Sequence, residues 1–139
     1  MKNVFILLLA LSVTACATKP ISYEQAKNVD INRIYAHDIT KQQANTVKIA
    51  VKRDMGFTGS GCYLALVING RLIADLDTGE KINVYLEPDD YVFAVKSSGV
   101  AICGSDILDE TEVVVRNGVF KQYRVGFDPA NAFIRRTSF

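Results

Sequence analysis

The chain has 139 residues, of which 49% are hydrophobic, and this length allows one domain with a single core and is too short for two. It carries 16 basic and 15 acidic residues, a formal net charge of +1. So balanced a chain lacks the basic footprint that binding to nucleic acid requires, and nucleic acid is excluded as a partner.

The N-terminus has the pattern of a removable leader. Lys2 precedes an apolar run over residues 4–11, which is too short to span a bilayer as a permanent helix. The run is followed by Val13-Thr14-Ala15-Cys16. This segment resembles the lipobox of bacterial lipoprotein precursors: an aliphatic residue, two small residues and an obligatory cysteine. We therefore predict a lipoprotein signal peptide over residues 1–15. The alternative is an ordinary signal peptide in which Cys16 has no role.

The lipobox resemblance implies that Cys16 is the first residue of the mature chain and carries acyl chains such as palmitate. Two or three chains would make the attachment to a membrane permanent. Ala17 follows, where an Asp would favour inner-membrane retention in enterobacterial lipoproteins. The resemblance thus implies a lipid-anchored protein on the outer membrane, facing the periplasm. Removing the leader leaves about 124 residues with 15 charges of each sign.

Residues 16–45 are predicted to be a lipidated tether. Ser22-Tyr23-Glu24-Gln25 has the form of a capping box, so a short helix is expected to begin there. The polar stretch Gln42–Asn45 is typical of the end of a spacer. From residue 46 the pattern changes, and residues 46–139 are predicted to form the folded domain.

Strict alternation begins with Val47, Ile49 and Val51, which are separated by Lys48 and Ala50. This period of two is typical of half-buried strands, and it recurs with turn residues between the runs. The predicted strands are 46–52, 62–68, 71–76, 81–87, 91–96, 112–116, 119–127 and 132–137, with a longer connection over 97–109. We predict an all-β domain, an antiparallel β-sandwich or small barrel of about seven or eight strands.

Two Asn-Gly pairs, at 69–70 and 117–118, lie between apolar runs. Both residue types tolerate positive φ, so this dipeptide is the strongest short signal for a type I′ hairpin. Each pair is therefore predicted to join two neighbouring strands of one sheet.

The chain has three cysteines. With Cys16 assigned to lipid, Cys62 and Cys103 remain as a pair in an oxidising compartment, and we predict a disulfide between them. The alternative is two buried free thiols.

Catalytic chemistry is not indicated. The single histidine, His37, lies in the predicted tether beside Asp38, and two neighbouring ligands do not make a metal site. No histidine remains in the domain for a Ser-His or Cys-His couple, and the acids gather in turns. We predict no enzyme activity, no metal and no cofactor.

The glycine-rich segment Gly56–Gly61 leads into Cys62 and no helix start follows it, so it is not a phosphate loop. It is expected to be a flexible connector ahead of the bridged strand. The alternative is an exposed recognition loop, with Phe57, Ser60 and Tyr63 as its contact residues.

Much of the domain resembles the DUF2846 type of bacterial lipoprotein domain and the short carbohydrate-associated β repeats called PEGA. These share a hairpin with a DG or NG turn, a GE turn, and a PG turn before a strand that begins with an aromatic residue. The matching residues here are Gly59-Ser60-Gly61-Cys62, Val67-Ile68-Asn69-Gly70, Leu76, Gly79-Glu80, Val84-Tyr85-Leu86, Pro88 and Tyr91. Asp89 stands where the family often has Gly.

Ser60-Gly61-Cys62-Tyr63 also fits the Ser-Gly-x-Tyr segment of small periplasmic lysozyme inhibitors, which are disulfide-bonded β-barrel lipoproteins. The main functional expectation is an outer-membrane-anchored lipoprotein with a non-enzymatic binding or structural role in the cell envelope and an envelope protein as partner. The alternative, implied by the second resemblance, is an inhibitor of a cell-wall hydrolase acting through the loop from Gly56 to Tyr63.

Overall fold

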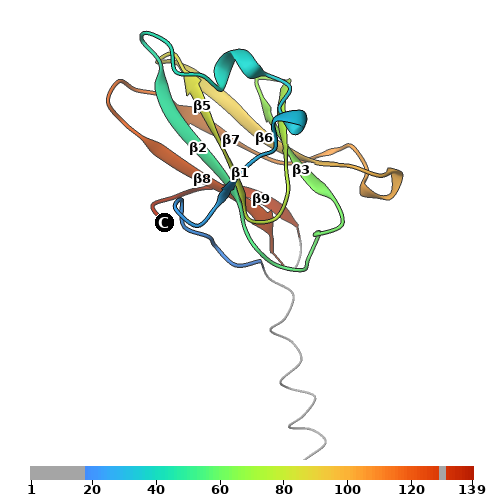
Figure 1. Cartoon of the computed structure of the whole chain (residues 1–139). Coiled ribbons are helices and arrows are strands. Elements are labelled where there is room, and N and C mark those ends of the chain that lie inside the picture. The colour runs from blue at the N-terminus through green and yellow to red at the C-terminus, as the bar shows by residue number, and fades with distance from the viewer. Residues whose placement is uncertain (1–17, 129–130) are drawn as a thin grey trace, which may run out of the picture.

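The computed structural model describes residues 18–128 and 131–139, which form a sandwich of two β-sheets (Figure 1). The predicted leader and Cys16 lie outside the described residues. The strands are β1 (Lys27–Asn28), β2 (Val47–Arg53), β3 (Tyr63–Ile68), β4 (Arg71–Leu76), β5 (Glu80–Leu86), β6 (Asp90–Ser98), β7 (Ile107–Val114), β8 (Lys121–Phe127) and β9 (Ala132–Thr137). Three short 3₁₀ helices join them: η1 (Ile31–Arg33), η2 (His37–Ile39) and η3 (Ala101–Cys103).

One sheet has five strands in the order β1-β5-β2-β8-β9, and the other has four in the order β4-β3-β6-β7. The β1–β5 and β2–β8 pairs are parallel, and the remaining pairs are antiparallel. The all-β sandwich prediction is therefore confirmed. The described residues contain nine strands, one more than expected, because the predicted tether contributes β1.

The core lies between the sheets and follows the predicted alternation. In β5, Ile82, Val84 and Leu86 are buried, whereas the residues between them are half-buried on the outer face. Phe93 of β6 and Tyr123 of β8 meet across the sandwich with ring centroids 5.8 Å apart. Inward positions from both sheets thus form one apolar layer, which is the main source of stability in such a fold.

The structure differs from the spacer expected over residues 16–45, because from Thr18 onward the chain lies on the sandwich. Ile21, Ala26, Val29 and Ala36 are buried. β1 pairs with the edge of β5, and farther along the segment Ile34 forms a bridge to Ala74 on the edge of β4. The segment therefore covers one edge of each sheet, and an edge with unpaired backbone groups is where cover is most needed.

The capping-box residues at 22–25 form a turn and no helix. Gln25 N donates to Ser22 Oγ over 3.3 Å, and Ser22 N donates to Gln25 Oε1 over 3.5 Å, so the reciprocal bonds of the motif are present. The chain then extends at once into β1, because its backbone bonds to β5 replace those of a helix.

The first Asn-Gly hairpin is confirmed and the second is not. Asn69 and Gly70 have φ of 47° and 78° and join β3 to β4 within one sheet. Gly118 also has positive φ, 71°, but the turn before β8 carries the chain from the four-stranded sheet to the five-stranded one. β8 pairs with β2 and β9 instead of β7.

β7 also begins earlier than predicted, at Ile107 rather than residue 112. Its first half is largely exposed and rich in acids, since it is an edge strand, and this hides the alternation. Asp109 has a structural role there, because its Oδ2 accepts a 2.8 Å bond from Ile134 N of β9 and so links the two sheets at this corner.

We call the end of the sandwich where the described chain begins the entry end; it contains Thr18, Asp54 and Phe127. Thr18 N donates to Phe127 O over 3.2 Å, and the Thr18 hydroxyl lies 2.9 Å from the same oxygen and 3.2 Å from Asp54 Oδ2. A Cβ on Gly126 would lie 2.7 Å from that hydroxyl, so glycine is required for this close approach. The chain is thus fixed to the sandwich from Thr18 on.

Charged side chains are buried at the entry end. Arg53, 1% exposed, donates to the carbonyl oxygens of Gly59, Cys62 and Leu76 over 2.7–2.8 Å. Asp54 is equally buried and accepts from the guanidinium of Arg124, with Nε 3.1 Å from Oδ1. Burial lowers the pKa of Arg53, which nevertheless stays charged, so its bonds to the three carbonyls are charge-assisted.

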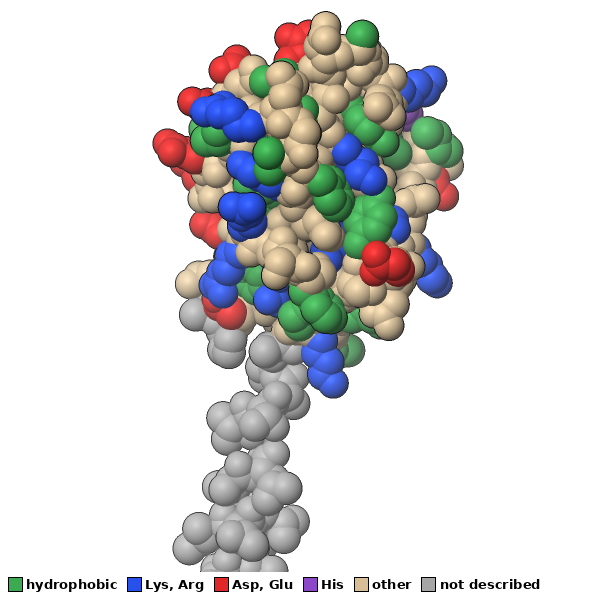
Figure 2. All heavy atoms as spheres, turned by 90° about the vertical axis from the view of Figure 1, so that its left-hand side faces the viewer, with side chains coloured by type: hydrophobic (Ala, Val, Ile, Leu, Met, Phe, Trp, Pro, Cys, Tyr) green, Lys and Arg blue, Asp and Glu red, His purple; other side chains and the backbone are tan. Residues whose placement is uncertain are grey.

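The outer face of the five-stranded sheet carries cations stacked on aromatic rings. Lys48 Nζ lies 4.7 Å from the ring centre of Phe120 and 5.1 Å from that of Tyr23, and Lys81 Nζ lies 3.8 Å from Tyr23. Basic side chains are spread over the side of the molecule seen in Figure 2. Burial of the Tyr23 hydroxyl acts to raise its pKa, but the bond to Asn83 and the two lysines lower it overall. These contacts hold the N-terminal segment against the sheet.

Candidate functional site

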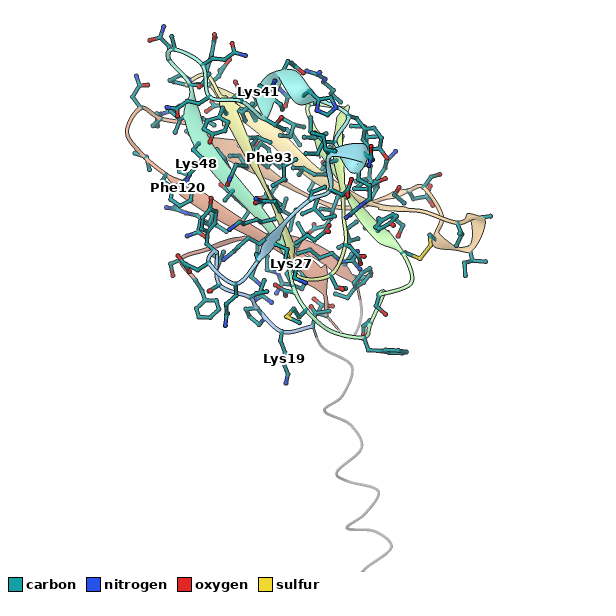
Figure 3. All side chains as sticks on the ribbon, viewed as in Figure 1. Lys19, Lys27, Lys41, Lys48, Phe93 and Phe120 are labelled. Atoms are coloured by element: carbon teal, nitrogen blue, oxygen red, sulfur yellow. A yellow bond between two sulfur atoms is a disulfide. The ribbon has the colours of Figure 1, made fainter. Side chains whose placement is uncertain are left out.

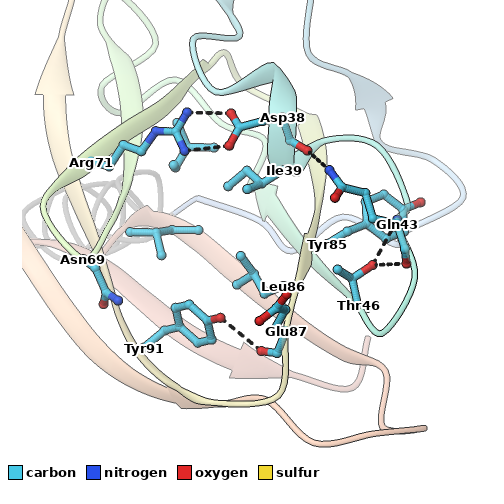
Figure 4. A pocket seen from close by; sticks show the side chains of 12 residues that line it. Asp38, Ile39, Gln43, Thr46, Asn69, Arg71, Tyr85, Leu86, Glu87 and Tyr91 are labelled. Atoms are coloured by element: carbon cyan, nitrogen blue, oxygen red, sulfur yellow. Dashed lines mark hydrogen bonds and ion pairs between the residues drawn. The ribbon is translucent and has the colours of Figure 1, made fainter.

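A pocket opens at the opposite end of the sandwich, where β2 begins, and we call this the open end (Figure 4). β2 runs from Val47 at the open end to Arg53 at the entry end, so about 20 Å of strand separates the two. The pocket has a volume of about 490 Å³, within the range of small-molecule sites. Its lining residues are Asp38, Ile39, Gln43, Thr46, Ile68, Asn69, Arg71, Ile73, Tyr85, Leu86, Glu87 and Tyr91.

The pocket is built where several chain reversals meet. The β3–β4 turn supplies Asn69, whose Oδ1 accepts a 2.8 Å bond from Val92 N and so ties the turn to β6. The connection from β5 to β6 supplies Glu87 and the start of β6 supplies Tyr91, whose hydroxyl donates to Glu87 O over 3.0 Å. These bonds hold the rim in place. One ties the β3–β4 turn to β6, and the other ties the β5–β6 connection to the start of β6.

An ion pair closes one side of the pocket. The Arg71 guanidinium donates to both oxygens of Asp38 over 2.5 and 2.8 Å, which joins η2 to the start of β4. Gln43 Nε2 donates to Asp38 O over 3.0 Å and holds the same segment from the other side. The bond from Arg71 lowers the pKa of Asp38, so the carboxylate is ionised at neutral pH and is already occupied by its partner.

The floor is apolar. Ile68, Ile73 and Leu86 belong to the core and are buried, and Ile39 of η2 packs against them. Above this floor stand the phenolic side chains of Tyr85 and Tyr91, both half-buried. An apolar floor with a rim of amides, hydroxyls and a paired charge suits a ligand that presents both an apolar surface and hydrogen-bonding groups.

The pocket lining contains no nucleophile–base couple. It has no histidine, cysteine or lysine; of its two carboxylates, that of Asp38 is bound to Arg71, and the other is that of Glu87. Burial raises the pKa of Tyr91, with Asp89 and Glu87 adding to the effect, so this phenol stays neutral at pH 7. The lining therefore offers a ligand hydrogen-bonding groups beside an apolar floor.

The predicted disulfide is confirmed. Cys62 and Cys103 are bonded with an S–S distance of 2.04 Å and a Cα–Cα distance of 5.7 Å. The bond ties the start of β3 to η3, the tip of the connection between β6 and β7. It lies away from the pocket, so its role is to fix the β6–β7 connection and the end of the glycine-rich loop.

The three residues of the predicted recognition loop have different surroundings. Phe57 is 90% exposed and Ser60 is also exposed, with Ser60 N donating to Phe57 O over 3.0 Å. Tyr63 belongs to β3, half-buried, with the Arg33 guanidinium 5.0 Å from its ring centre. Phe57 and Ser60 thus remain as loop contacts, and Tyr63 is held by Arg33.

The base of the loop is bonded to the sandwich. Arg53 bonds the carbonyl of Gly59, and a Cβ on Gly59 would lie 2.3 Å from the Phe127 ring. Gly59 has φ of 70°, which an L side chain rarely adopts. The base of the loop is therefore fixed on the sandwich, and Phe57 projects from a rigid support.

Asp38, the neighbour of His37, is already engaged by another side chain. Asp38 pairs with Arg71, and within residues 18–128 and 131–139 no group of three or more His, Cys, Asp or Glu side chains is arranged to hold a metal ion. The pocket is not predictable from the sequence, because its residues come from segments that are far apart in the chain. The burial of Arg53 and Asp54 is not predictable either, because charged residues are usually exposed.

Comparison with known proteins gives no relative: no family model matches the chain, and no curated protein or solved structure is significantly similar to it. The resemblances to DUF2846, PEGA and the lysozyme inhibitors stay predictions. None of the helices in the described part of the chain is long and apolar enough to cross a membrane.

Proposed function

We propose that this protein is a lipid-anchored envelope lipoprotein, non-enzymatic, which binds its partner at the open-end pocket. The proposal combines the lipobox, which is a sequence feature, with one structural observation. That observation is the position of Thr18 and the pocket at opposite ends of the sandwich. A lipid on Cys16 would hold the entry end at the membrane and leave the pocket facing away from it.

The pocket supports binding rather than catalysis, because its lining offers hydrogen-bond groups and apolar surface without a reactive couple. By resemblance to enterobacterial lipoproteins, Ala17 favours the outer membrane, with the domain in the periplasm. The partner is an envelope protein or one of its exposed segments, since a rim of tyrosines and amides matches the mixed surface of a polypeptide.

The alternative, inhibition of a cell-wall hydrolase through Gly56–Tyr63, has one observation in its favour, the exposure of Phe57. The position of the loop weakens it. Met55 and Gly56 lie against Lys19 and Thr18, so the loop begins beside the point where the chain enters the sandwich. An anchored loop at this end would face the lipid rather than a soluble enzyme.

Acylation is tested by labelling cells with tagged palmitate and comparing the full chain with the Cys16→Ser variant. We expect label in the wild type only, and co-sedimentation with outer-membrane fractions. Label in Cys16→Ser, or an unlabelled and fully soluble wild type, would refute the anchored lipoprotein.

Binding is tested in intact cells with a photocrosslinking phenylalanine analogue placed at Tyr85, and with the same analogue at Phe120 as the control. We expect a discrete adduct from position 85 and none from position 120. Equal adducts from both positions, or none from position 85, would count against the pocket as the binding site.

A further inference from the structure

We propose that the entry end itself contacts the membrane, with Phe57 inserted into the lipid interface and Lys19 and Met55 beside it. This inference rests on the proposed lipid anchor and goes beyond it. An anchor alone would let the domain swing freely, whereas this contact would fix its orientation.

The chain between the proposed anchor and the domain is very short. Thr18 follows Cys16 by two residues, and a residue spans at most about 3.6 Å, so the two Cα atoms are no more than about 7 Å apart. Thr18 is fixed by its bonds to Phe127 and by its contact with Asp54. A lipid on Cys16 would therefore bring the entry end to the bilayer surface.

Exposed apolar side chains lie beside the point where the chain enters the sandwich. Met55 exchanges two backbone bonds with Lys19, of 2.6 and 2.9 Å, and its side chain is 53% exposed. Gly56 packs on Thr18, where an added Cβ would lie 3.1 Å from the Thr18 Cα. Phe57 follows directly and is 90% exposed. Two large apolar side chains thus lie within a few residues of the place where the chain enters.

The loop that carries the exposed Phe57 is bonded to the sandwich at its base. The loop carbonyls of Gly59 and Cys62 accept bonds from the buried Arg53, and Cys62 is further fixed by its disulfide. The domain therefore leaves this ring in water. Aromatic side chains gain free energy by moving to a membrane interface, where an apolar ring sits at the level of the headgroups.

Lys19 supplies the matching polar contact. Figure 3 shows it at the lower end of the described chain, pointing away from the sandwich. A lysine beside an inserted aromatic ring can keep its ammonium group among anionic headgroups while its stem lies along the apolar surface. Since the mature chain has no net charge, the contact depends on the apolar side chains first and on Lys19 second.

The chain contains no tryptophan, so a single introduced tryptophan reports its own surroundings. The test compares Phe57→Trp with Phe120→Trp. Phe120 is also exposed, 45%, but precedes β8, whereas Phe127 of the entry end closes that strand. Full-length acylated protein of each variant is reconstituted into vesicles of phosphatidylethanolamine and phosphatidylglycerol, with and without lipids brominated near the headgroup end of the acyl chain.

We expect the emission of Phe57→Trp to shift to the blue and to be quenched at least twofold by the brominated lipids, with Phe120→Trp unaffected. Phe57→Trp combined with Cys16→Ser, free in solution, should emit as a water-exposed tryptophan. If the acylated protein floats with the vesicles while Phe57→Trp is not quenched, the membrane contact is refuted and the anchor stands. If the wild type carries no acyl chain and does not float, the anchor and this inference fall together.

Discussion

The two ends of the sandwich are built in different ways. At the entry end, Arg53 and Asp54 are buried, and both are bonded to groups from other segments of the chain. At the open end, the charged pair of Arg71 and Asp38 is exposed, and the apolar floor below it is reached from the surface. One end uses its polar groups to fix the fold, and the other leaves them at the surface.

The difference separates residues that are needed for stability from residues that are available for binding. A buried charge with three bonds to backbone oxygens is costly to remove, because its partners are left without donors. An exposed ion pair contributes little to stability and can be altered with small effect. The predictions that follow test this division from the largest expected change in the free energy of unfolding to the smallest.

The disulfide should have the largest effect. It closes a loop of 41 positions, for which the chain-entropy model gives about 4 kcal/mol. We expect the double variant Cys62→Ala, Cys103→Ala to lose about this much in urea unfolding, measured in a Cys16→Ser background. Reduction of the parent protein should cause the same loss. A loss of unfolding free energy below about 1 kcal/mol would mean that the disulfide contributes little to the stability of the fold.

Arg53→Met should come next. Methionine keeps much of the side-chain length but donates no hydrogen bond, so the carbonyls of Gly59, Cys62 and Leu76 lose their donor. We expect a loss of about 3 kcal/mol by urea unfolding. The matched control is Arg71→Met at the open end, which should shift the urea midpoint little. Equal losses in the two variants would remove the distinction between the ends.

Val84→Ala and Phe57→Ala separate core from loop. Val84 is fully buried in β5, and truncating it should cost roughly 1–3 kcal/mol through lost burial and a cavity. Phe57 is exposed, and its truncation should change stability by less than about 0.5 kcal/mol. Chemical denaturation of both variants, in the Cys16→Ser background, measures the two losses of stability. If Phe57→Ala were as destabilised as Val84→Ala, the ring would belong to the core and could not reach a membrane.

The Asp38–Arg71 pair should give the smallest effect. Arg71 lowers the pKa of Asp38, so the pair contributes above the ordinary carboxyl pKa of about 3.9 and this contribution is lost as the pH falls through the lower folded value. Because both side chains are more than half exposed, Asp38→Asn should have nearly the same urea midpoint as wild type at pH 7, and the small difference should shrink as the pH falls below the ordinary carboxyl pKa. A large loss at pH 7 would show that the open end is also built for stability.

The sequence was sufficient for the class of fold and the disulfide. The alternation in β5 and the Asn69-Gly70 turn are local signals, and each corresponds to a local structure. The Asn117-Gly118 turn shows what such local signals do not predict. They locate a reversal, but they carry no information on whether the next strand joins the same sheet, which depends here on the parallel pairing of β8 with β2.

The N-terminal segment and the pocket needed the structure. Ile21, Ala26 and Val29 have no strand or helix period, because they cover sheet edges rather than face a regular core. Tyr85 could be predicted only as an outward strand position. Its meeting with Gln43 and Thr46 depends on how the chain before β2 folds back over the end of β5, which no local pattern encodes.

The pairing of β2 with β8 also sets the order in which this molecule can fold. β2 is the middle strand of the five-stranded sheet, yet one of its two partners lies about 70 positions later in the chain. Until residues 121–127 are available, one edge of β2 stays unpaired, and such non-local closure slows folding.

When only the residues up to Gly118 are available, β2 can pair with β5 and the disulfide can form, but the five-stranded sheet cannot be completed. The Thr18 contact with Phe127 also requires the end of β8, because it joins residues 109 positions apart in the chain. Folding therefore waits for nearly the whole chain. For a protein exported as proposed, the segment at Thr18 would meet β8 only after both had crossed the membrane.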